Sequence, residues 1–317
     1  MTLKHTDTTE QIPGLEIVSR PGIYTGITKA QYHGNGLTPT LSLSASGAKT
    51  IIGSCLKAFW AKSPLNPDYE REDKKEFDIG EATHVLLLEP HDFDAKIKVV
   101  YADSWRTNAA KAERESAYLG GLIPLLVSDR EDVRAMRKAV HSDPVAGKLD
   151  FDDGLVEATM AWIDSETGVW LRCRPDFLPN HSRYMADLKT AASAKPADFA
   201  KAMKNLGYHQ QAAWYLDARE AVTGEQTAKF HFPVVEKKAP SLTATYTVDN
   251  DAVQWGRKQN RSAIRLFADA MARDEWPSYR DPADPWTPKA FQVKLPKYAL
   301  TELEQMQEAG VFAEPQD

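Results

Sequence analysis

Apolar and polar residues alternate most clearly between positions 155 and 190. Successive side chains of a β-strand point to opposite faces of its sheet, so this alternation predicts strands. The turn sequence DSETG divides the first two runs and predicts a hairpin, and the loop PNHS separates the second run from the third. The predicted strands cover residues 155–164, 169–178 and 183–190.

Charged residues take regular positions on the second and third predicted strands. Arg172, Arg174 and Asp176 are two residues apart and share one face, and Asp187 and Lys189 share a face of the next strand. A period of two therefore allows Asp176, Asp187 and Lys189 to converge at one edge of the sheet.

Helical spacing of apolar residues replaces this alternation on both sides of the predicted strands. One helix is predicted to begin at Ser44 or Ser46 and to end before Pro64, and a second, which carries His84, ends before Pro90. Taken alone, His84 is more simply a core histidine than a ligand. The other predicted elements are strands at 15–18, 97–100, 228–235 and 243–248, and helices at 109–118, 129–142, 249–273 and 300–308.

A further helix, predicted from about 197 to 220, follows the third strand directly. It places Tyr208, Gln211 and Tyr215 three and four residues apart, so that they line one stripe of its surface. The chain as a whole is predicted to form an N-terminal arm over residues 1–40, a core over 41–275 and a C-terminal extension over 276–317.

Composition narrows the class of protein without deciding its function. The 317 residues carry a formal net charge of -6, which argues against a protein that coats nucleic acid nonspecifically. No apolar run approaches the roughly 18–20 residues that span a bilayer, and the N-terminus lacks an apolar signal region. We therefore expect a cytoplasmic protein with no membrane partner.

The chain has two cysteines, Cys55 and Cys173, too few for a cysteine-ligated iron–sulfur cluster within it. A glycine-rich phosphate loop is missing, so no bound nucleotide is expected, and neither a helix-turn-helix nor a zinc finger indicates base-specific DNA reading. Any bound metal must therefore have oxygen and nitrogen ligands.

The pair Asp176 and Asp187 points to such a metal. Two neighbouring carboxylates repel each other unless a cation lies between them, and Mg²⁺ prefers oxygen ligands. Lys189 on the same face can contact the water or phosphate at the metal and offset negative charge that develops there. The D-x-K motif alone is common and ordinarily means an exposed ion pair on a strand.

The order of several short motifs is more specific than any one of them. An L-S-x-S helix start, G-x-x-x-H, R-P-D-F-L, D-L-K-T and Y-x-x-Q-x-x-x-Y follow one another between residues 42 and 280. This order resembles the PD-(D/E)xK nuclease superfamily, and within it the exonuclease VIII (RecE-type) nuclease domain, with the RecB nuclease domain more distant. The resemblance implies an α/β fold of restriction-endonuclease type, with a central mixed β-sheet flanked by helices.

The resemblance also implies a role for each matching residue. His84, Asp176, Asp187 and the backbone carbonyl of Leu188 would ligate Mg²⁺, with Mn²⁺ as an alternative ion. Lys189 would activate or orient the attacking water. Gln211 and Tyr215 would position the substrate phosphate or Lys189, with support from Tyr208, and Glu157 would act behind the metal ligands or on a second metal. Apart from the resemblance, Arg172 and Arg174 share the face of Asp176, where a basic side chain can contact a DNA phosphate and position the substrate. An ordinary ion pair with Arg174 explains Glu157 equally well.

The function implied is a Mg²⁺-dependent exonuclease that degrades one strand of duplex DNA from its 5′ end. It would act on duplex ends and leave 3′ single-stranded tails for an annealing recombinase partner. The resemblance also implies a homo-oligomer, such as a ring, and a phage or prophage origin of the protein. One alternative is a single-strand or structure-specific DNA nuclease of the same superfamily. Another is a catalytically inactive DNA-binding module.

Overall fold

The computed structural model describes residues 9–11, 18–69, 78–149, 151, 153–181 and 183–312. The chain divides into two compact units, Met1–Ser278 and Tyr279–Asp317. The second unit contains helix α11 (Lys297–Glu308), which buries none of its residues. Among the described helices, none is long and apolar enough to cross a lipid bilayer.

A six-stranded mixed sheet runs through the first unit in the order β11-β12-β10-β9-β6, with β13 added along β12. Strands β10 and β11 both lie parallel to β12 on the same side of it, so they are two parts of one interrupted strand. The bounds of these strands are β6 Gly154–Val156, β9 Phe177–Pro179, β10 Met185–Ala186, β11 Lys189–Ala191, β12 Phe230–Glu236 and β13 Thr243–Thr247.

A second sheet has five strands in the order β1-β2-β7-β8-β3, and β4 and β5 form a separate parallel pair. The hairpin predicted around the turn DSETG is present, with β7 and β8 antiparallel. The bounds are β1 Thr9–Gln11, β2 Gly22–Thr25, β3 Leu43–Ser44, β4 Ile97–Val100, β5 Ile123–Leu126, β7 Thr159–Ile163 and β8 Trp170–Cys173.

Two strands predicted as continuous instead pass from one sheet to the other. The run 155–164 breaks at Glu157, whose φ of 48° lies in the left-handed region, and forms β6 and then β7. The run 169–178 leaves β8 after Cys173 and enters β9 at Phe177. Alternation of side chains continues through such a break, so the sequence pattern could not reveal it. Asp176 lies at this crossing, where its carbonyl accepts a hydrogen bond of 3.0 Å from the Glu157 amide.

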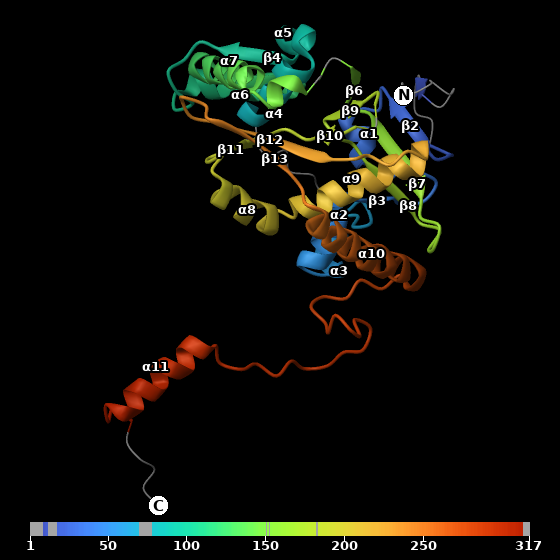
Figure 1. Cartoon of the computed structure of the whole chain (residues 1–317), viewed down its shortest axis with the longest axis vertical. Coiled ribbons are helices and arrows are strands. Elements are labelled where there is room, and N and C mark those ends of the chain that lie inside the picture. The colour runs from blue at the N-terminus through green and yellow to red at the C-terminus, as the bar shows by residue number, and fades with distance from the viewer. Residues whose placement is uncertain are drawn as a thin grey trace, which may run out of the picture. The chain divides into compact units, whose positions relative to one another are not determined.

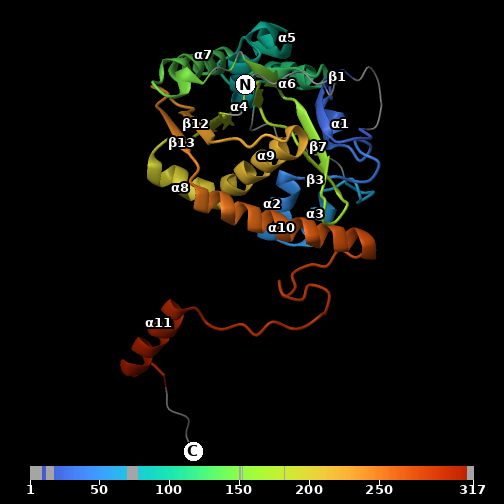
Figure 2. The ribbon, with the colours of Figure 1, turned by 45° about the vertical axis from the view of Figure 1, so that its right-hand side comes forward.

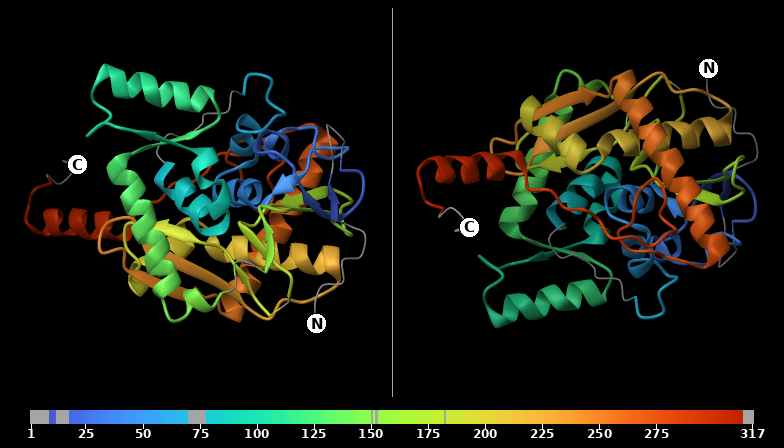
Figure 3. Two further views of the ribbon diagram at one scale, coloured as in Figure 1. Left: turned by 90° about the horizontal axis from the view of Figure 1, so that it is seen from above. Right: turned by 90° about the horizontal axis from the view of Figure 1, so that it is seen from below.

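Helices cover both sides of the six-stranded sheet. Figures 1 and 2 show α8, α9 and α10 on one side with α2 and α3, and α4, α5, α6 and α7 on the other. Seen from below, α10 crosses α9 (Figure 3). Their bounds are α1 Lys29–His33, α2 Ala45–Gly53, α3 Leu56–Ala61, α4 Asp78–Leu88, α5 Phe93–Lys96, α6 Asn108–Leu119, α7 Val127–Ser142, α8 Pro196–Asn205, α9 Tyr208–Thr223 and α10 Asn250–Arg273, with short 3₁₀ turns at Pro90–Asp92 and Ala146–Lys148.

The structure divides two of the predicted helices. The helix expected at 197–220 ends after α8, because Gly207 adopts a left-handed φ of 64° and begins α9 as its N-cap. The helix expected from Ser44 to Pro64 divides after Gly53 into α2 and α3. Strand β5 was not predicted, since four apolar residues between two helical patterns carry no period of their own.

Residues 18–40 are part of the first unit, which differs from the expected peripheral arm. Strand β2 pairs with β7, and Tyr24 and Tyr32 pack in one apolar cluster with Trp170 of β8. Burial of two aromatic rings explains why this segment joins the core. The strand expected at 15–18 lies outside the described residues except for Val18, which is buried.

The main apolar core fixes α4 and α7 against the six-stranded sheet. It joins Ala82 and Val85 of α4 and Met136 of α7 to Phe177 and Leu188 of the sheet. Phe177 and Leu188 each adjoin an acidic residue of the predicted site. The burial of these apolar neighbours therefore also fixes the positions of Asp176 and Asp187.

Asp164, which directly follows β7, connects the β7–β8 hairpin to α10. Its carboxylate accepts hydrogen bonds from Thr167 and from Arg261 of α10 at 2.8–2.9 Å. Burial alone would raise the pKa of Asp164, but these hydrogen bonds outweigh it and lower that pKa. A carboxylate with a lowered folded pKa stabilises the fold above its unfolded pKa, and this stability is lost as the pH falls through the folded pKa.

We therefore predict that Asp164→Asn lowers the free energy of unfolding by about 1–3 kcal/mol at pH 7. The difference from the natural chain should shrink below about pH 4, as measured by urea denaturation across a pH series. The control, Glu166→Gln, removes an exposed partner of Arg265 and should change little. An Asp164→Asn effect that stays constant down to acidic pH would contradict this assignment.

Candidate functional site

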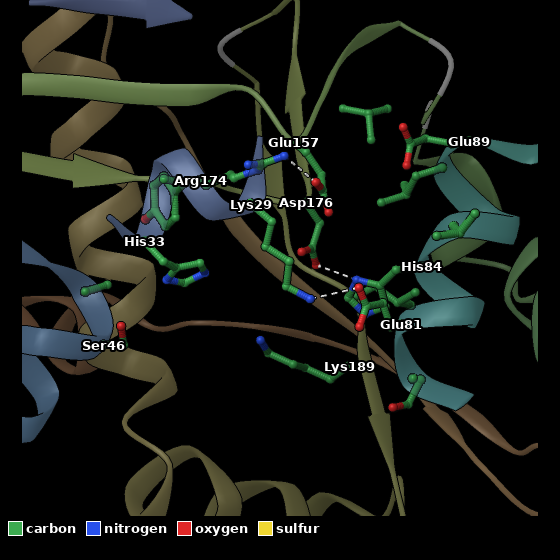
Figure 4. Close-up of a pocket in the computed structure, with 18 of the residues that line it drawn as sticks. Lys29, His33, Ser46, Glu81, His84, Glu89, Glu157, Arg174, Asp176 and Lys189 are labelled. Carbon is green, nitrogen blue, oxygen red and sulfur yellow. Dashed lines mark hydrogen bonds and ion pairs between the residues drawn. The ribbon is translucent and has the colours of Figure 1, made fainter. Parts of the chain in front are cut away.

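A cavity of about 730 Å³ opens at the point where β10 gives way to β11. Helix α4 forms one wall, with α1 and α2 opposite (Figure 4). The labelled side chains in this view include His84 of α4, Lys29 of α1 and Asp176 and Lys189 from the sheet. Eight of the residues predicted for the site line this cavity: His84, Glu157, Arg174, Asp176, Leu188, Lys189, Gln211 and Tyr215.

Asp187 occupies the interruption between β10 and β11 and is 2% exposed. Lys189 contacts its Oδ2, and the Gln211 side-chain amide of α9 donates a hydrogen bond of 2.9 Å to its Oδ1. The carbonyl oxygen of the same Gln211 side chain accepts a bond of 3.4 Å from Lys189 Nζ. The predicted group of Asp187, Lys189 and Gln211 is thus a closed set of contacts.

Asp176 meets His84 on the other side of the same interruption. His84 Nδ1 lies 3.2 Å from Asp176 Oδ2 (Figure 4), and the backbone amide of Leu188 donates a hydrogen bond to the Asp176 carboxylate. Gly80 permits this approach, because a Cβ at its position would lie 3.0 Å from the Thr190 hydroxyl of β11. His84 follows one turn later on α4, so the glycine lets this helix deliver it to the sheet.

Proximity changes the protonation of the two acids in opposite directions. Burial raises the pKa of Asp187, and the neighbouring Asp176 raises it further against the opposing effect of Lys189. Burial would also raise the pKa of Asp176, but His84 and Lys189 outweigh it and lower that pKa. Neighbouring carboxylates whose pKa values are shifted in opposite directions are typical of a functional site.

The two acids raise the pKa values of both basic partners, Lys189 and His84. Burial alone would lower the pKa of Lys189, but Asp187 and Asp176 outweigh it and raise that pKa. Likewise, Asp176 outweighs the effect of burial and raises the pKa of His84. At neutral pH Lys189 is therefore an ammonium, which can donate hydrogen bonds and stabilise negative charge but cannot accept a proton.

Tyr208 and Tyr215, both predicted to support the substrate, contact the site differently. Lys189 Nζ lies 4.6 Å from the centre of the Tyr208 ring and 5.7 Å from that of Phe232, close enough for cation–π attraction. The Tyr215 hydroxyl instead donates a hydrogen bond of 3.3 Å to the Arg174 carbonyl. Tyr208 and Phe232 therefore flank the lysine, and Tyr215 lines the cavity beside it.

Glu157 and Arg174 line the cavity, whereas Arg172 lines an adjoining pocket. Arg174 donates a hydrogen bond of 2.5 Å to Glu157, and both line the cavity (Figure 4). The ordinary ion pair considered for Glu157 is therefore present. Arg172 is 7% exposed, bonds the carbonyl and hydroxyl of Ser42, and lines an adjoining pocket instead.

Sequence reasoning missed three cavity-lining residues. Lys49 of α2 lies near Lys189, and burial followed by repulsion from Lys189 lowers its pKa to about 8. Lys29 of α1 reaches Glu81 of α4 at 2.9 Å across the cavity (Figure 4). Both lysines reach the cavity through contacts between distant segments of the chain, and neither has a local sequence pattern that distinguishes it from a solvent-exposed lysine.

Residues 44–285 match the model of a family described as a PDDEXK-like domain of unknown function (DUF3799). The chain belongs to this family. No curated protein matches its sequence.

The fold of this PDDEXK-like chain is shared by a solved structure from Eubacterium rectale described as a "putative exonuclease". The TM-score is 0.52 at 16% sequence identity, and the match covers 82% of this chain and 92% of the other. The predicted superfamily and fold class are thus confirmed, with mixed sheets flanked by helices. The closer relationship to RecE-type nucleases stays a prediction.

The donor atoms of the PDDEXK-like site fit a divalent metal ion. Asp176 Oδ2 and Asp187 Oδ2 are buried and neither accepts a hydrogen bond of normal geometry. Carboxylate oxygens of this kind are preferred ligands of Mg²⁺ and Mn²⁺, and the neighbouring imidazole of His84 is a common nitrogen ligand of divalent metals. Within the described residues, however, no three His, Cys, Asp or Glu side chains form a compact metal-binding group. The ligand set of His84, Asp176, Asp187 and the Leu188 carbonyl stays a prediction.

We predict that Mn²⁺ or Mg²⁺ raises the melting temperature of the natural chain, because a ligand that binds only the folded state stabilises it. Asp176→Asn and Asp187→Asn should each remove most of this rise in thermal melts with and without metal. The control is Asp217→Asn on α9, whose carboxylate pairs with Arg257 outside the cavity, and it should keep the full rise. A full rise in Asp187→Asn would contradict the metal assignment.

Proposed function

We propose that this chain is a Mg²⁺-dependent nuclease that hydrolyses phosphodiester bonds in DNA. The observation that carries the proposal is that Lys189 and Gln211 contact buried Asp187 and line one cavity together with Asp176 and His84. Lys29, Lys49 and Arg174 line the same cavity, and side chains of these types are common contacts of a phosphate backbone.

Each side chain has a role that follows from its surroundings. Lys189, kept protonated by the two acids, would hold a phosphate oxygen or the attacking water and stabilise charge on phosphorus. Gln211 holds both Lys189 and Asp187 through opposite ends of its amide, so it fixes their separation. A divalent cation bound by the carboxylates would supply Lewis acidity and lower the pKa of a bound water.

The proposed reaction is exonucleolytic. The E. rectale structure with the same fold is described as a "putative exonuclease", which supports this mode of cleavage. We further propose digestion of duplex ends from the 5′ terminus, leaving 3′ tails for an annealing recombinase, by a homo-oligomer. A nuclease that acts on single strands or branches is the second candidate, because Asp176 and Lys189 lie in a cavity lined by side chains from several elements rather than on an open surface.

One assay tests cleavage and polarity together. Duplex DNA labelled at either the 5′ or the 3′ end should lose the 5′ label first, as mononucleotides, in the presence of Mg²⁺. Lys189→Met should slow this release by about 10²-fold or more, since removal of one donor to a transition-state charge has costs of that order. Lys204→Met, on the exposed face of α8, is the matched control and should retain activity.

Three outcomes would contradict parts of these proposals. Equal rates for Lys189→Met and Lys204→Met, with both variants folded by circular dichroism, would exclude the assigned site. Release of label only from single-stranded or branched DNA would favour the second candidate over the first. Internal cuts without loss of end label would exclude the exonuclease.

A further inference from the structure

A second pocket of about 540 Å³ adjoins the cavity that holds Asp176 and Lys189. The two share His33, Ser44 and Ser46 as lining residues, so they form one continuous depression across α1 and the start of α2. The volume falls within the range of about 300–1,000 Å³ typical of small-molecule sites. No role proposed above uses this second pocket.

Arg172 on β8 lines the second pocket from a buried position. It is 7% exposed, its Nη1 donates bonds of 2.8 and 2.7 Å to Ser42 O and Oγ, and Tyr32 is its other partner. Its Nε is buried and forms no hydrogen bond. The arginine therefore has a donor left without a partner beside a pocket.

The charge of Arg172 is also uncompensated. Within the part of the chain that the structure describes, no carboxylate forms an ion pair with it, and its acidic-type neighbour Tyr32 stays neutral because burial raises the pKa of that phenol. An isolated buried charge is costly and is ordinarily paired with an opposite charge. The missing counter-charge at a pocket wall indicates an anionic ligand.

The other walls suit a nucleotide rather than a bare anion. Lys62, at the end of α3, adds a second positive charge, and the rings of His33, Phe59 and Tyr69 line the same pocket. Aromatic rings stack with the bases of unpaired strands, and a basic groove follows their phosphates. A paired duplex could not place a phosphate against an arginine that is so deeply buried.

We propose that this second pocket binds a nucleotide of single-stranded DNA next to the bond being cleaved, with its phosphate at Arg172 and Lys62. The inference deepens the proposed nuclease function and rests on it for the identity of the strand. The strand would pass over His33, Ser44 and Ser46 between the two pockets. Arg172 would thus position the substrate through a phosphate other than the reacting one. Its place on the strand face of Asp176 had instead predicted a position beside the reacting phosphate.

Binding of a short 5′-fluorescein-labelled oligothymidylate in EDTA tests this site without requiring cleavage. Arg172→Met should raise the Kd about tenfold or more, as expected for loss of a hydrogen bond to a charged group. The slope of log Kd against log[NaCl] should fall by about 0.7, the value for one phosphate contact on a single strand. Arg172→Lys should restore part of both effects because it keeps the charge.

Two further variants keep the test decisive. Replacement of a buried ion by a hydrophobic residue is often neutral for stability, and circular dichroism checks that Arg172→Met folds. If it does not, Lys62→Ala at the exposed end of α3 carries the test and should also lower the slope by about 0.7. Lys57→Ala on the same helix is the matched control, because Lys57 stacks on Trp60 outside both pockets.

Two results would overturn the proposal. One is no measurable binding of the oligonucleotide by the natural chain. The other is equal affinity and salt slope for the Lys62→Ala, Lys57→Ala and folded Arg172→Met variants. Failure of the nuclease function is seen separately: a chain that never cleaves DNA with Mg²⁺ but loses affinity in Arg172→Met would contradict the nuclease and support this pocket.

Discussion

The burial of two carboxylates side by side is the constraint on which the rest of this structure depends. Asp187 is almost fully covered, and Asp176 lies close enough to raise the pKa of Asp187. Such a pair is tolerated only where cations and hydrogen-bond donors surround it. Lys189, His84 and Gln211 meet this need, and each comes from a different element.

The interruptions in the strands are what bring these side chains together. Asp187 lies where β10 gives way to β11, and Asp176 lies where the chain crosses from β8 to β9. Continuous strands would bond their backbones to neighbours along their whole length and leave less room for side chains to converge. The cost of the breaks is offset by the core beneath them, in which Phe177 and Leu188 pack against α4 and α7.

The sequence pattern predicted most contacts among the acids, Lys189 and Gln211, but it did not predict where the strands cross from one sheet to the other. The period of two correctly placed Lys189 beside Asp187, and helical spacing placed Gln211 on the face that meets them. The same period could not show that the runs around Glu157 and Arg174 change sheets, because alternation continues through the crossing. Arg172 shares the strand face of Asp176 in sequence, yet the crossing separates them into two pockets.

Long-range contacts account for the other differences. Tyr24 and Tyr32 join the core only because β2 pairs with β7, more than a hundred residues later in the chain. Lys49 reaches the site because α2 packs against α9, and nothing in its local pattern distinguishes it from a solvent-exposed lysine. Local sequence therefore predicts the acids and their immediate partners better than the basic residues that surround them.

A crystal structure of the full chain grown with Mn²⁺ tests the central claim most directly, because the anomalous signal of manganese locates the ion without reference to the protein. Assignment of the metal to this site predicts one strong anomalous peak between the carboxylates of Asp176 and Asp187, within coordinating distance of the His84 imidazole. Manganese bound elsewhere, with these two carboxylates still paired only to Lys189 and His84 at saturating metal, would contradict it.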